Sequence, residues 1–122
     1  MALLNSAEET LLLHNPGCSK SRATLALLEE RGAPFRVRPY LDEPLTRAEL
    51  DELQASLGKS PKEWVRRGQA EYSDAGLDAN SAESAVLEAM VQAPVLMERP
   101  IVVCGNRAAI GRPPQNVLEI LD

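Results

Sequence analysis

A short apolar run, a Pro-Gly turn and a helical pattern follow one another near the start of the sequence, and this succession constrains the fold more than any other feature. The apolar segment Leu11 to Asn15 stops at Pro16-Gly17, which predicts a buried strand followed by a turn. From Ser19 to Arg31 the apolar residues recur with helical spacing, and Gly32 predicts the helix end. Cys18 is therefore expected in the turn between a strand and a helix.

Three further segments have the patterns of strands. Phe35 to Tyr40 alternates apolar and polar residues, and its proline is typical of an edge strand or a strand end. The apolar run Ile101 to Cys104 is followed by a turn at Gly105-Asn106, after which Arg107 to Ile110 can pair back as a hairpin. A last helix is expected to end at Leu121.

The middle of the chain predicts helices with clear starting signals. Thr46 to Glu49 has capping-box spacing ahead of a helical pattern, and Ser60 to Glu63 repeats that spacing. We expect a polar loop over Gly68 to Asn80. A further helix is then expected to begin at Ser81 and to stop before Pro94.

The order of these elements indicates an α/β fold with a mixed four-stranded sheet flanked by helices. The first two strands flank a crossover helix and should be parallel, whereas the last two should form an antiparallel hairpin. A helical insertion at about residues 45–93 separates the second and third strands. We find no repeat, linker or low-complexity tract, and we therefore predict one domain over residues 1–122.

Composition excludes several classes of function. The net charge is −5 and the sequence pI is about 4.9, which argues against a nucleic-acid partner because phosphate binding needs a basic face. No apolar run approaches the roughly 20 residues that span a bilayer, so no membrane partner is expected. Two cysteines are too few for a disulfide framework. We expect a cytoplasmic protein whose Cys18 stays a free thiol.

Cys18 has the sequence surroundings of a reactive cysteine. At a helix start, free backbone N–H groups and the positive end of the helix dipole favour a thiolate. His14, Lys20 and Arg22 add titratable or positive groups, and the Ser21 hydroxyl can face back toward the sulfur. We therefore predict that His14 and Ser21 tune the thiolate. The alternative is a cysteine that only fills space, but such a residue belongs among apolar neighbours in the middle of an element.

The cysteine spacing predicts single-thiol chemistry. A Cys-x-x-Cys pair would allow dithiol exchange, but the fourth position here is Ser21. The expected cycle is attack by Cys18, a mixed intermediate and rescue by an external thiol. Cys104 lies well along its strand from Pro100 and is expected to be buried and inert.

Three arginines next to turns or helix ends are candidate anion ligands: Arg66, Arg99 and Arg112. Arginine offers a planar fork of donors that suits an oxyanion, and three of them around a helix N-terminus would form an oxyanion pocket. Spacing alone leaves open the alternative that any one of them is an ordinary surface arginine.

Several motifs together resemble one known family over nearly the whole chain, from Leu11 to Leu121. The sequence is similar to the glutaredoxin-linked arsenate reductase (ArsC) family, and most similar to its short, YfgD-like branch, in which the chain ends soon after the last helix. The matching runs are His14-Asn15-Pro16-Gly17-Cys18-Ser19-Lys20-Ser21-Arg22, Pro39-Tyr40-Leu41, Trp64-Val65-Arg66-Arg67, Arg99-Pro100-Ile101-Val102-Val103 and Gly111-Arg112-Pro113.

This resemblance implies a thioredoxin/glutaredoxin-like fold and a set of roles. It implies that Cys18 is the nucleophile and that Arg66, Arg99 and Arg112 hold the oxyanion. Pro100 is implied to be a cis proline. Both Pro100 and Asn15 are expected to be structural residues near the site.

The resemblance also implies the reaction and its partners. The expected activity is reduction of arsenate to arsenite through a cysteinyl-arsenate intermediate on Cys18, and it depends on glutathione and glutaredoxin. The expected partner is arsenate or a similar oxyanion. Glutathione is then a co-substrate, and we expect no bound cofactor, no metal and a monomer.

Two alternatives stay open on the sequence. A general glutathione-dependent thiol transferase would use the same thiolate but would need no arginine trio. A redox regulator that binds RNA polymerase, of the Spx type, would carry a Cys-x-x-Cys switch, which Ser21 breaks here.

Overall fold

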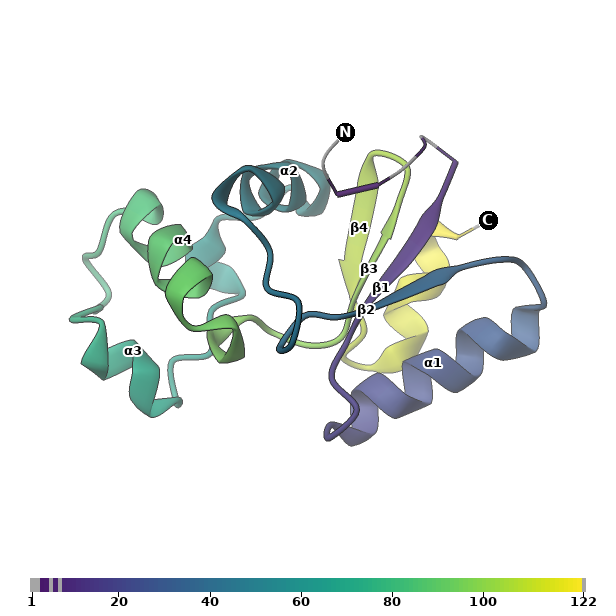
Figure 1. The fold of residues 1–122 in the computed structure, drawn as a ribbon, viewed down its shortest axis with the longest axis horizontal. Coiled ribbons are helices and arrows are strands. Elements are labelled where there is room, and N and C mark those ends of the chain that lie inside the picture. Colours follow the sequence, from purple (N-terminus) through teal and green to yellow (C-terminus); the bar gives the residue numbers. More distant parts are fainter. Residues whose placement is uncertain (1–2, 5, 7, 122) are drawn as a thin grey trace.

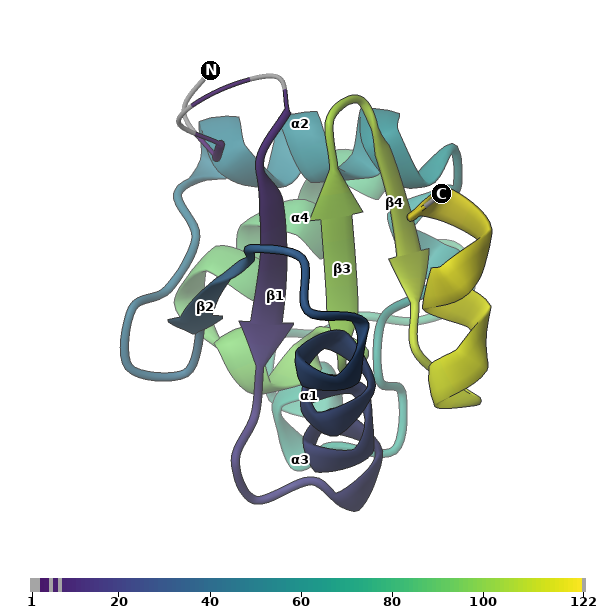
Figure 2. The same cartoon turned by 90° about the vertical axis from the view of Figure 1, so that its right-hand side faces the viewer.

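The computed structural model describes residues 3–4, 6 and 8–121, and its centre is a four-stranded sheet with the order β2-β1-β3-β4. The strands are β1 (Thr10–His14), β2 (Arg36–Pro39), β3 (Ile101–Cys104) and β4 (Arg107–Ile110). β1 pairs in parallel with β2 and antiparallel with β3, and β3 pairs antiparallel with β4 (Figure 2). The mixed sheet, the parallel first pair and the terminal hairpin are confirmed.

Helices cover both faces of the sheet (Figures 1 and 2). One face carries α1 (Ser19–Arg31) and the 3₁₀ helix η3 (Pro114–Ile120). The other carries the helical insertion, by which we mean residues 47–96 between β2 and β3. Its members are α2 (Arg47–Leu57), η1 (Pro61–Glu63), α3 (Ala70–Asp74), α4 (Glu83–Gln92) and η2 (Pro94–Leu96).

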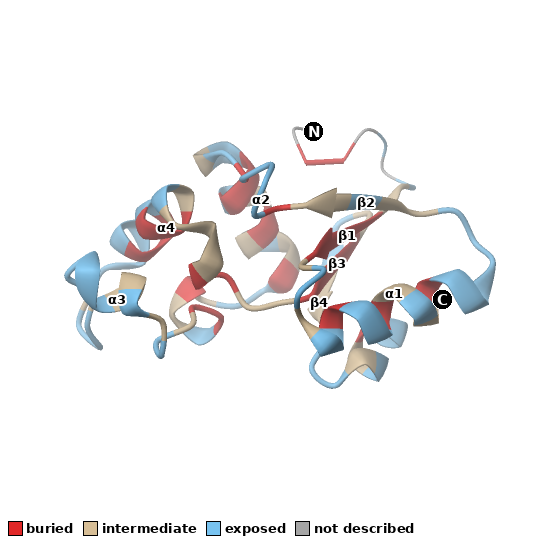
Figure 3. Ribbon diagram, turned by 60° about the horizontal axis from the view of Figure 1, so that its bottom comes forward, coloured by how far each residue is buried: buried red, intermediate tan, exposed pale blue. Residues whose placement is uncertain are grey.

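Alternation along the central strands creates two separate cores. Successive side chains of a strand point to opposite faces. Leu11 and Leu13 of β1 accordingly join the larger cluster beneath the insertion, whereas Leu12 joins Leu28 of α1 and Val117 of η3 on the other face. Because both faces are covered, β1 and β3 are buried along almost their whole length (Figure 3).

The predicted helix boundaries follow local signals. α1 begins directly after Cys18, whose extended backbone (φ −106°, ψ 125°) makes it the N-cap, and ends at Gly32 in the left-handed region. Thr46 and Glu49 form a complete capping box at the start of α2. Ser60 forms a second one, which opens only the short 3₁₀ helix η1.

Three predicted elements differ from the structure. The expected loop over residues 68–80 contains the five-residue helix α3. The N-cap of α4 is Ala82 rather than Ser81, because the Ser81 hydroxyl accepts a hydrogen bond from the Asp78 N–H (2.9 Å) in the preceding turn. The last helix is of the 3₁₀ type and ends at Ile120.

Candidate active site

The loop between β1 and α1 is held by its own hydrogen bonds. The Cys18 N–H donates to the Asn15 carbonyl (3.0 Å), and the Gly17 N–H donates to the Asn15 side-chain oxygen (2.9 Å). Arg22 donates from Nη1 to the Pro16 carbonyl (2.8 Å), so its guanidinium braces the loop. Cys18 is thereby fixed at the start of α1.

Cys18 is half-buried, and its surroundings favour the thiolate. Burial acts to raise the pKa of this thiol, but the backbone N–H groups of Ser21 and Lys20 and the guanidinium of Arg99 outweigh it, so that the pKa lies below its ordinary value. The sulfur makes no capping hydrogen bond of standard geometry. The N–H groups therefore act on the pKa through their orientation toward the sulfur.

His14 and Ser21 form a buried pair beneath the loop. The two side chains are joined by a hydrogen bond between His14 Nδ1 and Ser21 Oγ (2.7 Å), and Ser21 Oγ also accepts from the Asn15 N–H (2.9 Å). Burial, and then the charge of Arg22, lower the pKa of His14, so the imidazole is neutral at neutral pH. Whereas the sequence suggested a hydroxyl facing the sulfur, Ser21 approaches the sulfur with its backbone N–H.

Arg99 reaches the site because of the sheet register. Leu13 pairs with Ile101, so the extension of β1 at Asn15 lies level with Arg99, just before β3. The Arg99 guanidinium faces Cys18 and lowers its pKa. Its Nη1 lies 3.4 Å from the Glu98 carboxylate, while its Nε is buried and has no hydrogen-bond partner.

Arg66 comes to the same place from the insertion. An isolated bridge pairs Val65 with Met97, and the Arg66 N–H donates to the Leu96 carbonyl (2.7 Å). The Arg66 side chain donates from Nη1 to the Val95 carbonyl (3.1 Å). Burial and the neighbouring Arg99 lower the pKa of Arg66, whereas the Cys18 thiolate acts in the opposite direction. The two guanidinium groups therefore lie near each other and near the sulfur.

Arg112 lies at the margin of this group. It is exposed, and its Nη1 donates to the Arg99 carbonyl (3.4 Å). The bond between Arg99 and Pro100 is cis, as the resemblance implied, and so is the bond between Arg112 and Pro113, which the sequence did not indicate. Arg112 is therefore joined through this hydrogen bond to the segment that carries Arg99 and the cis proline.

Tyr40 is a site residue that the sequence did not single out by role. It directly follows β2 and is 1% exposed, and its hydroxyl makes no hydrogen bond of standard geometry, although the Asn15 side chain lies close to it. Burial raises the pKa of Tyr40, while Arg99, Arg66 and the side-chain amide of Asn15 act to lower it, which places the phenol among these groups. The signal available beforehand was its place in the run Pro39-Tyr40-Leu41.

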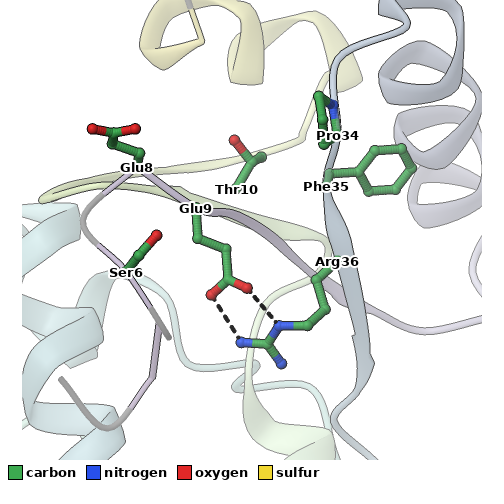
Figure 4. Close-up of a pocket in the computed structure, with 7 residues that line it drawn as sticks. All are labelled: Ser6, Glu8, Glu9, Thr10, Pro34, Phe35 and Arg36. Carbon is green, nitrogen blue, oxygen red and sulfur yellow. Dashed lines mark hydrogen bonds and ion pairs between the residues drawn. The ribbon is translucent and has the colours of Figure 1, made fainter.

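Cys104 lies at the opposite end of the central strands, near the start of β1. It pairs with Thr10 at the start of β1, and the Thr10 hydroxyl donates to its sulfur (3.6 Å). The expectation of a buried Cys104 is wrong, because the residue is half-buried. The same end of the sheet has a shallow depression of about 370 Å³, where Glu9 pairs with Arg36 (Figure 4). It contains none of the candidate site residues.

Neither a metal cluster nor a membrane-spanning helix occurs among the described residues. Residues 3–4, 6 and 8–121 contain no group of three or more histidine, cysteine, aspartate or glutamate side chains that could hold a metal ion. Within the same part of the chain, no helix has the length and apolar character needed to cross a membrane.

Known proteins resemble this chain over most of its length. The model of the ArsC family matches residues 13–120. The protein YfgD of Escherichia coli is 46% identical over 93% of this chain and 98% of its own, and an arsenate reductase of Neisseria meningitidis is 43% identical over the same shares. A solved arsenate reductase from Vibrio cholerae is 42% identical, with a TM-score of 0.88 over 95% of this chain and 100% of its own.

Proposed function

Because this chain belongs to the ArsC family of thioredoxin-like proteins, we propose that it is an oxidoreductase that reduces arsenate to arsenite. The observation that carries the proposal is the position of Cys18 at the start of α1, with its pKa lowered and the Arg99 guanidinium facing it. The relatives named arsenate reductase support the choice of substrate.

In the first step the Cys18 thiolate attacks the As(V) atom of arsenate. A sulfur–arsenic bond forms and one arsenic–oxygen bond breaks, and the leaving oxygen takes up protons from solvent and departs as water. A thiolate is the reactive form of cysteine, so the lowered pKa makes this step accessible at neutral pH. The product is a cysteinyl-arsenate.

Positive groups around the sulfur suit the charge of this intermediate. Arg66 and Arg99 are close to Cys18, and Arg112 lies beside Arg99. Donors fixed in place before the reaction stabilise developing charge without rearrangement. We propose that these arginines hold the non-bridging oxygens of arsenate.

The reducing electrons come from external thiols. A glutathione thiolate attacks the Cys18 sulfur, a disulfide forms, and the electron pair of the broken sulfur–arsenic bond stays on arsenic, which leaves as As(III) in arsenite. A glutaredoxin thiolate then attacks the glutathione sulfur and releases Cys18 as a thiolate. In total, arsenic gains two electrons and two thiols lose them, so this scheme needs no bound cofactor.

The position of Cys104 supports the need for an external thiol. It pairs with Thr10 at the start of β1, whereas Cys18 follows the end of that strand. Two cysteines whose Cα atoms are more than about 7 Å apart cannot be bridged without movement of the backbone. A strand of this length separates them by more than that, and Cys104 is therefore unsuited to resolve an intermediate on Cys18.

The test is arsenate-dependent oxidation of NADPH in the presence of glutathione, glutaredoxin and glutathione reductase. We expect turnover by the wild-type chain and none by Cys18→Ser, since serine cannot form the sulfur–arsenic bond. Cys104→Ser is the matched control and should keep wild-type turnover. Full activity of Cys18→Ser, or loss of activity in both variants alike, would contradict the scheme.

The thiol-transferase alternative is separated by its substrate. A transferase would reduce a glutathione mixed disulfide with glutathione and glutathione reductase when glutaredoxin is left out of the assay, and it would show no dependence on arsenate. Wild-type activity on the mixed disulfide alone would replace the proposed function with that alternative.

A further inference from the structure

Two buried side-chain atoms in the described part of the chain have no hydrogen-bond partner, namely Tyr40 Oη and Arg99 Nε. Buried polar groups are almost always paired in native proteins, because an unpaired group loses its bonds to water without replacement. Tyr40 itself is 1% exposed. Two unpaired buried polar atoms therefore need an explanation, such as a ligand that binds to both of them.

The sheet register brings these two atoms to one place. His14 pairs with Pro39 on one side of β1, and Leu13 pairs with Ile101 on the other. One residue beyond the end of β1, Asn15 is therefore flanked by Tyr40 and Arg99. Cys18 follows in the same short loop, with its N–H bonded to the Asn15 carbonyl.

The two side chains also lie close to each other. Tyr40 belongs to the core beneath the insertion, together with Leu13 and Ile101. The Arg99 guanidinium is close enough to the Tyr40 phenol for its charge to act on the pKa of that phenol. The unpaired phenol and the unpaired guanidinium nitrogen thus lie on either side of the loop that carries the sulfur.

The phenol is a neutral donor at neutral pH. Burial raises the pKa of Tyr40, so its hydroxyl keeps its proton. Arg66 and Arg99 already repel each other, since Arg99 lowers the pKa of Arg66. A neutral donor at this point can bind an oxygen without adding to that repulsion.

We propose that Tyr40 is a substrate-binding residue, whose hydroxyl donates a hydrogen bond to one oxygen of the bound oxyanion while Arg99 Nε–H donates to another. The inference rests on the proposed function and deepens it, because it specifies the ligand as an anion with at least two oxygen acceptors next to the Cys18 sulfur. Such a ligand would satisfy both unpaired atoms at once.

The test is binding of arsenate and of sulfate to Tyr40→Phe, followed through the ultraviolet absorbance of the Cys18 thiolate. Phenylalanine keeps the buried ring and removes only the hydroxyl. We expect the Kd for arsenate to rise by about 10-fold to about 100-fold, the loss of one hydrogen bond to a charged group. The melting temperature should equal or exceed that of the wild type, since the lost hydroxyl has no partner in the free protein.

The matched control is Tyr72→Phe. Tyr72 is the second of the two tyrosines, lies in α3 of the insertion and is outside the site. Its loss of a hydroxyl should leave both the Kd and turnover unchanged. A Kd that rises equally in the two variants would overturn the proposal.

Other outcomes separate this inference from the function on which it rests. If the wild type binds an oxyanion and Tyr40→Phe binds it equally well, the role of Tyr40 is overturned and the proposed function stands. If Tyr40→Phe raises the pKa of Cys18 without any anion, the hydroxyl serves the thiolate instead, and the inference is overturned. Weaker anion binding by Tyr40→Phe, with no arsenate reduction by the wild type, would support the contact and overturn the proposed reaction.

Discussion

One half-buried cysteine lies at each end of the central strands of the sheet, and the two differ in the backbone N–H groups that surround the sulfur. We call them the Cys18 end and the Cys104 end. Cys18 lies where β1 ends and α1 begins, and the N–H groups of Ser21 and Lys20 are directed toward its sulfur. Cys104 lies inside the hairpin, between Thr10 of β1 and Arg107 of β4, where it takes part in strand pairing. Two cysteines of the same burial class can therefore have different backbone surroundings.

The difference shows that the position of a cysteine in the secondary structure determines whether free backbone N–H groups surround its sulfur. The first N–H groups of a helix have no partner within the helix and are free to stabilise an anion, whereas N–H groups in a sheet are used by neighbouring strands. At Cys18 the Arg99 guanidinium then adds a positive charge to the backbone N–H groups that already favour the thiolate.

The largest effect on activity is expected from replacement of Arg99, the arginine that faces Cys18. Arg99→Ala should lower kcat/KM for arsenate by about 10²-fold to about 10³-fold, the usual cost of removing one donor from an oxyanion site. Arg107→Ala is the matched control, because Arg107 lies opposite Cys104 and donates to the Ile120 carbonyl. Coupled NADPH assays on both variants measure the difference. An unchanged kcat/KM in Arg99→Ala would show that Arg99 matters no more than Arg107, and it would favour a thiol transferase.

A smaller effect is expected from the packing between α1 and the cis proline that follows Arg99. A Cβ atom added at Gly111 would lie 2.8 Å from Pro100 Cγ and 2.8 Å from Thr24 Oγ1, between the cis proline and α1. Gly111→Ala should therefore destabilise the protein by about 1–3 kcal/mol, as overpacking generally does. Urea denaturation measures this change. Gly68→Ala, where the added atom meets nothing within 4 Å, should stay within about 0.5 kcal/mol of the wild type.

The smallest effect is expected in the rate of alkylation of the two thiols. Iodoacetamide should modify Cys18 in the Cys104→Ser variant several-fold faster at neutral pH than it modifies Cys104 in the Cys18→Ser variant. Because the pKa of Cys18 is lowered, its alkylation rate should level off at a lower pH than that of a free cysteine peptide and should fall as the pH drops through the lowered value. A rate for Cys18 that levels off at the same pH as the free peptide would contradict the lowered pKa.

The elements that could be predicted from the sequence are those with complete local signals. Gly32 ends α1 in the left-handed region, and the Thr46 capping box opens α2, because each signal consists of residues a few positions apart. Where a signal had competing uses, prediction failed. Ser81 has the chemistry of an N-cap, yet the preceding turn uses its hydroxyl. The five-residue helix α3 is too short to show a hydrophobic period and has no buried residue.

The candidate site divides in the same way. The local sequence indicated the place of Cys18 at a helix start, and the neighbouring residues His14 and Ser21 lie in the same loop and helix turn. The sequence could not show that Arg112 donates to the Arg99 carbonyl or that the Tyr40 phenol lies near Arg66 and Arg99. Those facts depend on which side chains meet across separate elements.

The sequence by itself determined the strand, the turn and the helix that place Cys18 among free backbone N–H groups, because all the residues involved are neighbours in the chain. Only the tertiary structure decided which groups surround that sulfur. The pairing of β1 with β2 and β3 brings up Tyr40 and Arg99, and the bridge between Val65 and Met97 brings up Arg66. Local signals act over a few residues, whereas these contacts arise only when distant segments pack into one sheet and its insertion.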